Sequence, residues 1–73
     1  MDLTGAPTRS LLRVVHLGVD GRAGLRLREL GLRPGAVVEV THDARAQGRV
    51  VAVGAERFAL DRHTCTRIAV EPA

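Results

Sequence analysis

The sequence has no tryptophan, no tyrosine, no lysine and only one phenylalanine, Phe58. A hydrophobic core must therefore be built from aliphatic side chains, mostly valine and leucine. The scarcity of aromatic rings also argues against single-stranded nucleic acid as a ligand, because such binders usually stack bases on exposed rings. At 73 residues, the chain forms one small domain, which buries only about 60% of its unfolded surface.

A single cysteine, Cys65, is present. An internal disulfide is therefore excluded, which suits a reducing cytosol. The N-terminal residues lack the apolar core of a signal peptide, and no apolar run approaches the roughly 20 residues needed to span a bilayer. We therefore expect a cytoplasmic protein that reaches a membrane only through a partner.

The formal net charge is +3, and all 11 cations are arginine. The arginines are scattered along the chain among eight acidic residues. This distribution favours an ordinary solvated surface over a nucleic-acid footprint, which would be clustered.

The clearest local signals lie between residues 25 and 41. Leu27 and Leu30 are three positions apart, so a short helix would place both on one face, where packing must hold it. Gly31 is placed to end that helix in the left-handed conformation. Leu32 can fold back onto the last turn, as the residue after a glycine cap often does.

A turn and a strand follow directly. In Pro34-Gly35, proline fixes φ at the second turn position, and glycine tolerates the positive φ of a type II turn at the third. Alternation of apolar and polar residues then predicts a strand over residues 36–41, with Val38 and Val40 on its buried face.

Four further segments have the composition of short strands, with brief turns between the later ones: residues 11–17, 49–53, 57–60 and 66–70. The first of these is predicted to bend, because Leu12 and Val14 share one face while Val15 and Leu17 share the other.

The remaining segments are polar or rich in glycine, and we interpret them as connections: a flexible N-terminal arm at residues 1–10, loops at 18–24 and 42–48, and a single turn at 61–65. The sequence thus predicts an all-β domain over residues 11–73. Its expected architecture is a small, partly open barrel of five strands, with one short helix inserted between the first two.

No catalytic constellation is recognisable, and the spacing of Gly18, Gly21 and Gly24 matches no phosphate-binding fingerprint. The candidate metal ligands lack the spacing of a metal motif: His16, His42, His63 and Cys65. We therefore expect a protein that is not an enzyme, has no catalytic residue or metal ligand set, and does not bind ferrous iron tightly on its own.

The segment Arg28-Glu29-Leu30-Gly31-Leu32-Arg33-Pro34-Gly35, followed by Val38 and Val40, resembles the signature of the FeoA family. FeoA proteins are the small cytosolic components of bacterial ferrous iron transport. Residues 58–60 and 68–70 are similar in spacing to that family's last two strands. Two positions depart from the pattern: residues 43–48 contain no proline, and Cys65 stands where the family usually has alanine.

This resemblance implies an SH3-like barrel, which agrees with the predicted strand count. The same domain ends the DtxR-type metal-dependent repressors, and the absence of a helical DNA-binding region here favours the stand-alone protein. The resemblance further implies docking on FeoB, the membrane ferrous iron transporter with a cytosolic G-domain. Iron would then be only the ion that the partner transports, and no cofactor is expected.

The expected partner-binding surface is the solvent face of the short helix and the turn after it, comprising Arg26, Arg28, Leu32 and Arg33. Arginine forks suit carboxylates on a partner protein. An exposed edge strand of the open barrel could also support weak self-association. The alternative interpretation is a KOW-like small barrel that binds RNA or ribosomal components, which residues 34–40 and the loop ending at Gly48 would also fit.

Overall fold

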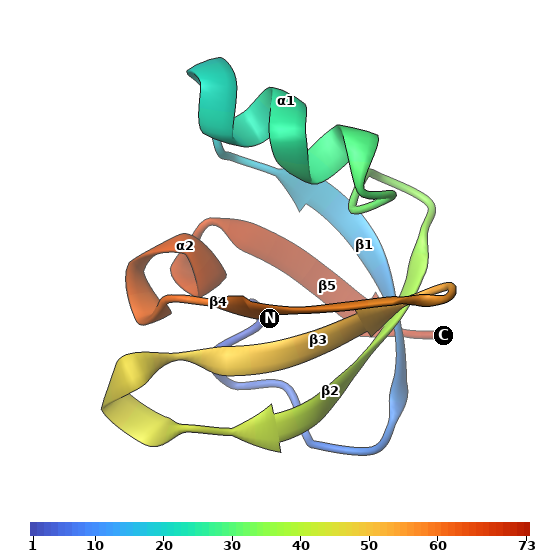
Figure 1. Cartoon of the computed structure of the whole chain (residues 1–73). Helices are drawn as coiled ribbons and strands as arrows, with labels where there is room; N and C mark the ends of the chain where they lie inside the picture. Colours follow the sequence, from blue (N-terminus) through green and yellow to red (C-terminus); the bar gives the residue numbers. More distant parts are fainter.

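The computed structural model describes all 73 residues and has the predicted all-β architecture, an open barrel with a short helix after the first strand (Figure 1). The five strands form one antiparallel sheet in the order β4-β3-β2-β1-β5. They are β1 (Leu11–Leu17), β2 (Val37–Asp43), β3 (Arg49–Val53), β4 (Glu56–Leu60) and β5 (Ile68–Pro72). The helices are α1 (Gly21–Glu29), the 3-10 helix η1 (Arg45–Gln47) and α2 (Arg62–Thr66).

Strand β1 differs from the predicted bend. Its pairing with β5 shifts register between Val14 and His16, which is the signature of a β-bulge. The extra residue resets the alternation, so Leu12, Val14 and Leu17 all point into the barrel. Val15, predicted to share a face with Leu17, is exposed instead.

Helix α1 ends as the sequence predicts. Gly31 has φ +100°, and its N–H donates to the carbonyl of Arg28 at 3.0 Å. The N–H of Leu32 donates to the carbonyl of Leu27 at 2.9 Å. These two bonds form the Schellman motif. Leu27 is buried and Leu30 is half-buried, so both predicted leucines face inward to different extents.

The helix begins earlier than expected, at Gly21, so residues 21–24 of the predicted loop over residues 18–24 are helical. Gly24 is buried within α1, and a Cβ at that position would lie 1.9 Å from the carbonyl oxygen of Val19. The close approach of helix and preceding loop therefore requires glycine here, which periodicity alone does not reveal.

The predicted turn and strand after α1 are both present. Ala36 donates to the carbonyl of Arg33 at 3.0 Å across Pro34-Gly35, and Gly35 has φ +92°. These features are those of a type II turn. In β2, Val38 and Val40 are buried, as the alternation predicts.

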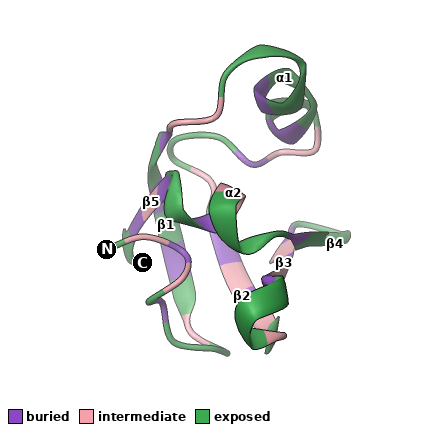
Figure 2. Ribbon diagram, turned by 90° about the vertical axis from the view of Figure 1, so that its left-hand side faces the viewer, coloured by how far each residue is buried: buried purple, intermediate pink, exposed green.

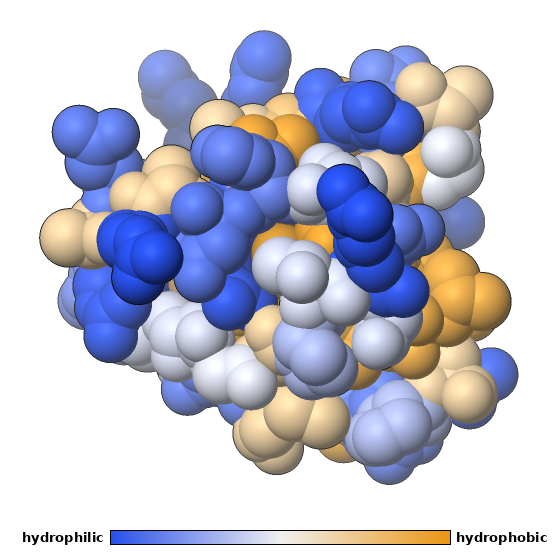
Figure 3. All heavy atoms as spheres, turned by 90° about the horizontal axis from the view of Figure 1, so that it is seen from below, coloured by the Kyte–Doolittle hydropathy of each residue, from blue (hydrophilic) through white to orange (hydrophobic).

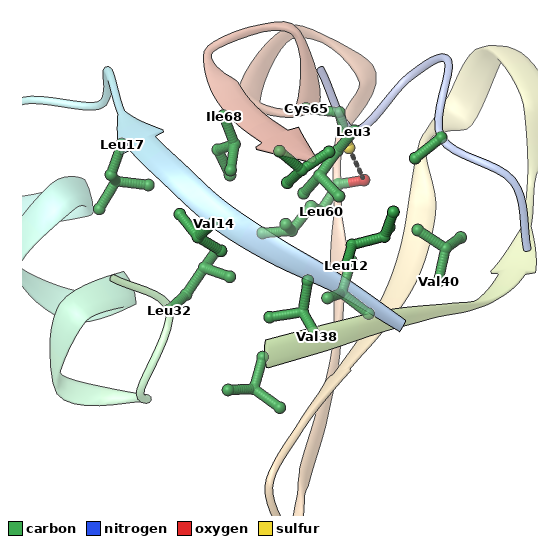
Figure 4. Packing of buried hydrophobic residues seen from close by; sticks show 14 of the residues in the cluster. Leu3, Leu12, Val14, Leu17, Leu32, Val38, Val40, Leu60, Cys65 and Ile68 are labelled. Atoms are coloured by element: carbon green, nitrogen blue, oxygen red, sulfur yellow. Dashed lines mark hydrogen bonds between the residues drawn. The ribbon is translucent and has the colours of Figure 1, made fainter. Parts of the chain in front are cut away.

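The core is a single cluster of 15 buried hydrophobic residues that contains no aromatic side chain and no buried polar residue. Figure 4 shows leucines and valines from β1, β2 and β4 converging with Cys65 and Ile68. Phe58 only packs against the edge of this cluster.

Residues 1–10, interpreted above as a flexible arm, pack onto the barrel. Leu3 and Ala6 are buried, and the Leu3 N–H donates to the carbonyl of Ile68 at 3.1 Å. Arg49 donates to the carbonyls of both Leu3 and Ala6. This contact is not predictable from the sequence, because two isolated apolar residues produce no periodicity.

The polar turn predicted at residues 61–65 is the one-turn helix α2. Asp61 caps it by accepting a hydrogen bond from the Thr64 N–H at 2.7 Å. Cys65 is fully buried, as a small apolar residue would be. Strand β5 begins at Ile68 instead of Thr66, because α2 occupies the preceding residues.

Candidate docking surface

Helix α1 stands at one end of the barrel and leaves most of its surface to solvent (Figures 1 and 2). Only Gly24 and Leu27 are buried among its residues. A helix this short needs packing to persist, and its contacts are concentrated at its C-terminal end, where Leu32 enters the core. The helix therefore presents an exposed face whose side chains the barrel does not use.

Three of the four predicted contact residues are exposed on α1 and the turn after it, although Arg26 and Arg28, two positions apart, point to different sides of the helix. Arg26 and Arg28 belong to the last turn of α1, and Arg33 lies in the turn that follows. All three are exposed, and their side chains make no hydrogen bond or ion pair. Cations in the last helical turn are favoured by the negative end of the helix dipole, so the helix itself tolerates this charge.

Leu32, the fourth predicted residue, does not belong to the surface. Its side chain has 0% exposure, because the Schellman motif turns it back into the core beside Leu27. The predicted fold-back of Leu32 after the glycine cap is confirmed, and its place in the predicted contact surface is wrong. A partner cannot touch Leu32 while the barrel is folded.

A different leucine, Leu25, is exposed on α1, with 57% of its surface accessible. Arg22 and Arg28 lie three residues before and after it, which places all three on one side of the helix. Leu25 was not among the predicted contact residues. Its exposure could have been predicted from the sequence, because Leu25 lies outside the helical stripe defined by Leu27 and Leu30.

The segment from Asp20 to Gly35 is basic. It holds four arginines and two acids: Arg22, Arg26, Arg28 and Arg33 against Asp20 and Glu29. An exposed apolar side chain with arginines nearby is a composition found at protein interfaces, where arginine is enriched over lysine. The chemistry that it best recognises is a partner surface with carboxylates around an apolar depression.

A second exposed apolar area is broken up by charge. Leu11, Val15 and Val37 lie on the outer side of β1 and β2, but Arg13 is paired opposite Val37 and Glu39 opposite Leu11. In Figure 3, hydrophobic residues lie toward the right-hand side of the view, next to hydrophilic ones.

The candidate metal ligands do not converge. His16, His42 and His63 are exposed on β1, β2 and α2 respectively, and no group of three His, Cys, Asp or Glu side chains comes together. Burial raises the pKa of the Cys65 thiol, which disfavours the thiolate that a metal would need.

One shallow depression lies away from α1, beside the start of β5. His16, Thr66 and Arg67 contribute to its lining, and the Arg67 Nε donates to the Gly18 carbonyl at 2.7 Å. No helix of the structure has the length and apolar character that crossing a bilayer demands.

Comparison with known proteins agrees with the observed fold. A family model described as the FeoA domain matches residues 1–72. A search of curated proteins finds no match. Among solved structures, FeoA of Stenotrophomonas maltophilia, determined in complex with zinc and described as a prokaryotic SH3 domain protein, has a TM-score of 0.82 and 28% identity. That match covers 97% of this chain and 89% of the other.

Two further structures are similar. A crystal structure of an iron uptake regulatory protein, FeoA, has a TM-score of 0.86 at 25% identity and covers 100% of this chain and 97% of that one. Iron(II) transport protein A of Clostridium thermocellum has a TM-score of 0.87 at 23% identity, covering 100% of this chain. The match spans only 46% of the Clostridium chain. With a family match over almost its whole length and an SH3-like barrel, this chain belongs to the FeoA family, which is involved in ferrous iron transport.

Proposed function

We propose that this protein is a non-enzymatic, cytoplasmic interaction module that docks on a FeoB-type membrane iron transporter and modulates it. Membership of the FeoA family supports the link to ferrous iron uptake. The observation that carries the docking proposal is the group of exposed arginines on α1 and the turn after it, because Arg26, Arg28 and Arg33 have no partner within the chain.

The exposed arginines suit an acidic partner surface. A guanidinium can donate two parallel hydrogen bonds to one carboxylate, which gives direction as well as attraction. Leu25 would supply an apolar anchor among these contacts, in the manner of a hot spot ringed by polar groups. Docking would remove Leu25 from water and pair the free arginines in one step.

Modulation follows from differential binding. A module without catalytic groups can change its partner only by binding one conformation more tightly than another. A preference of about 1.4 kcal/mol between two transporter states shifts their ratio tenfold. A few well-placed arginine–carboxylate contacts, formed in one state and absent in the other, supply a difference of this size.

The experiment is an affinity capture from membrane extracts with this protein as bait. We expect recovery of an iron transporter, and reduced recovery with Arg28→Glu. Arg62→Glu, on α2, is the matched control because Arg62 is also an exposed helical arginine with no partner. Recovery of RNA that falls steeply with salt, without the transporter, would instead support the KOW-like alternative.

A further inference from the structure

The curled sheet has two outer edges, and the chain covers only one of them. Along β5, the Leu3 N–H donates to the carbonyl of Ile68, and the Val70 N–H donates to the carbonyl of Met1 at 2.8 Å. The N-terminal residues thus pair with that edge. Along β4, no backbone hydrogen bond beyond those to β3 is made by residues 56–59. In Figure 2, β4 is the outermost strand, on the side away from the N-terminal segment.

The hairpin geometry identifies which groups on β4 face outward. A two-residue turn, Gly54-Ala55, joins β3 to β4 without any register shift. Residues beside such a turn form a hydrogen-bonded pair, and every second residue after it does the same. The residues directed at β3 are therefore Glu56, Phe58 and Leu60. The N–H and C=O groups of Arg57 and Ala59 point away from the sheet.

This edge is accessible and lacks the usual interruptions. Glu56, Arg57 and Ala59 are exposed, and Phe58 is half-buried. No proline and no bulge interrupts β4, although both are common devices that protect an edge from pairing. Two outward donors and two outward acceptors are consequently free to bind another strand.

We propose that β4 pairs antiparallel with β4 of a second copy of this chain, with the two-fold axis at Phe58. In that register Arg57 lies opposite Ala59 of the second copy, and Ala59 lies opposite its Arg57. Each of these pairs exchanges both of its backbone hydrogen bonds, so all outward groups of β4 are satisfied. Phe58 lies opposite its own copy in a non-hydrogen-bonded pair, where side chains approach most closely.

Charge and symmetry favour this occupant and register. An axis at Arg57 would place two arginines directly opposite each other, which is destabilising. With the axis at Phe58, Arg57 lies opposite Ala59, and its two diagonal neighbours in the second copy are Arg57 and Asp61. The arginines are then no longer directly opposite each other, and each has an Asp61 of the second copy within reach of its long side chain. Neither Arg57 nor Asp61 has an ion-pair partner within its own chain. Phe58, which is only half-buried where it packs against the core, would thereby gain a further contact.

Substitution at Ala59 tests the proposal. The Ala59 N–H is not used within the chain, and proline is tolerated where a strand N–H faces solvent. Ala59→Pro should therefore keep the fold and remove two of the four intermolecular bonds, whereas the matched control Ala59→Val keeps every N–H. By sedimentation velocity from micromolar to millimolar concentration, we expect wild type and Ala59→Val to shift from 7.8 kDa toward twice that mass. Association of Ala59→Pro should be weaker by ~10-fold or more.

Amide exchange of the wild type gives a second, independent readout. Exchange of the Arg57 and Ala59 amides should slow as concentration rises, while the Phe58 amide, already bonded to β3, should not change. The proposal is overturned if the wild type stays monomeric at millimolar concentration. It is equally overturned if folded Ala59→Pro associates like wild type, or if concentration-dependent protection appears elsewhere and not at these two amides.

Discussion

The N–H of Leu32 bonds to the carbonyl of Leu27 at 2.9 Å, and both leucine side chains are buried together in the core. This pair joins the end of α1 to the barrel. Because Gly24 and Leu27 are the only buried residues of α1, the helix keeps its position largely through this one attachment. The exposed arginines of α1 are therefore held in place by a few apolar contacts.

Truncation of Leu27 tests this attachment. Leu27→Ala removes the main apolar contact of α1 and should lower the free energy of unfolding by about 2–5 kcal/mol, a large fraction of the stability of a small domain. Leu30→Ala should cost less, because Leu30 is only half-buried. Urea denaturation provides the measurement. Leu25→Ala, at an exposed position, is the control, with a change of about 0.5 kcal/mol or less. Equal effects at Leu27 and Leu25 would show that α1 does not depend on this contact.

The sign of the stability change on replacing Gly24 tests the close approach of α1 to the preceding loop. At an ordinary exposed helix position, replacing glycine by alanine stabilises a protein by about 0.5–1 kcal/mol. At Gly24 the added Cβ would lie 1.9 Å from the Val19 carbonyl oxygen, so Gly24→Ala should destabilise the protein. Thermal melts of Gly24→Ala and of Ala23→Gly, the exposed neighbour, should both fall below wild type. A melting temperature of Gly24→Ala above that of wild type would contradict the close approach.

The cap of α2 predicts a pH dependence. Hydrogen bonds from the backbone and side chain of Thr64 hold the pKa of Asp61 below its ordinary value of 3.8. A lowered pKa in the folded state contributes stability that is complete above 3.8 and is lost as pH falls through the folded value. The stability advantage of wild type over Asp61→Ala, followed by chemical denaturation, should therefore shrink below pH about 4. An advantage that stays constant down to pH about 2 would contradict the charged cap.

The isolated protein is predicted not to bind ferrous iron tightly. Because no group of three His, Cys, Asp or Glu side chains comes together, we expect no stoichiometric site of micromolar or tighter affinity for ferrous iron. Anaerobic isothermal titration calorimetry is the measurement. A single saturable site of that affinity would contradict the expectation, and His63→Ala and His16→Ala would then locate it.

The sequence predicted those parts of the fold that rest on local rules. Gly31, Pro34-Gly35 and the alternating valines of β2 each specify one backbone conformation, and all three behave as expected. The bulge in β1 was not predictable, because it depends on pairing with β5, which lies far away in the chain.

The solvent exposure of the candidate contact residues was predicted in part, and their role in docking stays a prediction. Arg26, Arg28 and Arg33 follow from helical geometry and solvent exposure. The assignment of Leu32 to the contact surface was wrong, because a residue that folds back after a glycine cap is directed into the core and cannot also face a partner. The packing of Leu3 and Ala6 was missed because their contacts are made with β3 and β5 and leave no local pattern.

The most direct test of docking through α1 is the affinity of this protein for a purified FeoB-type transporter in lipid nanodiscs. We expect Arg28→Glu to weaken binding by ~10-fold or more, because it replaces a guanidinium on the α1 face by a carboxylate. Arg62→Glu, which makes the same charge change on α2, should bind like wild type. Equal affinities of wild type and a folded Arg28→Glu variant, or equal losses in both variants, would contradict docking through α1.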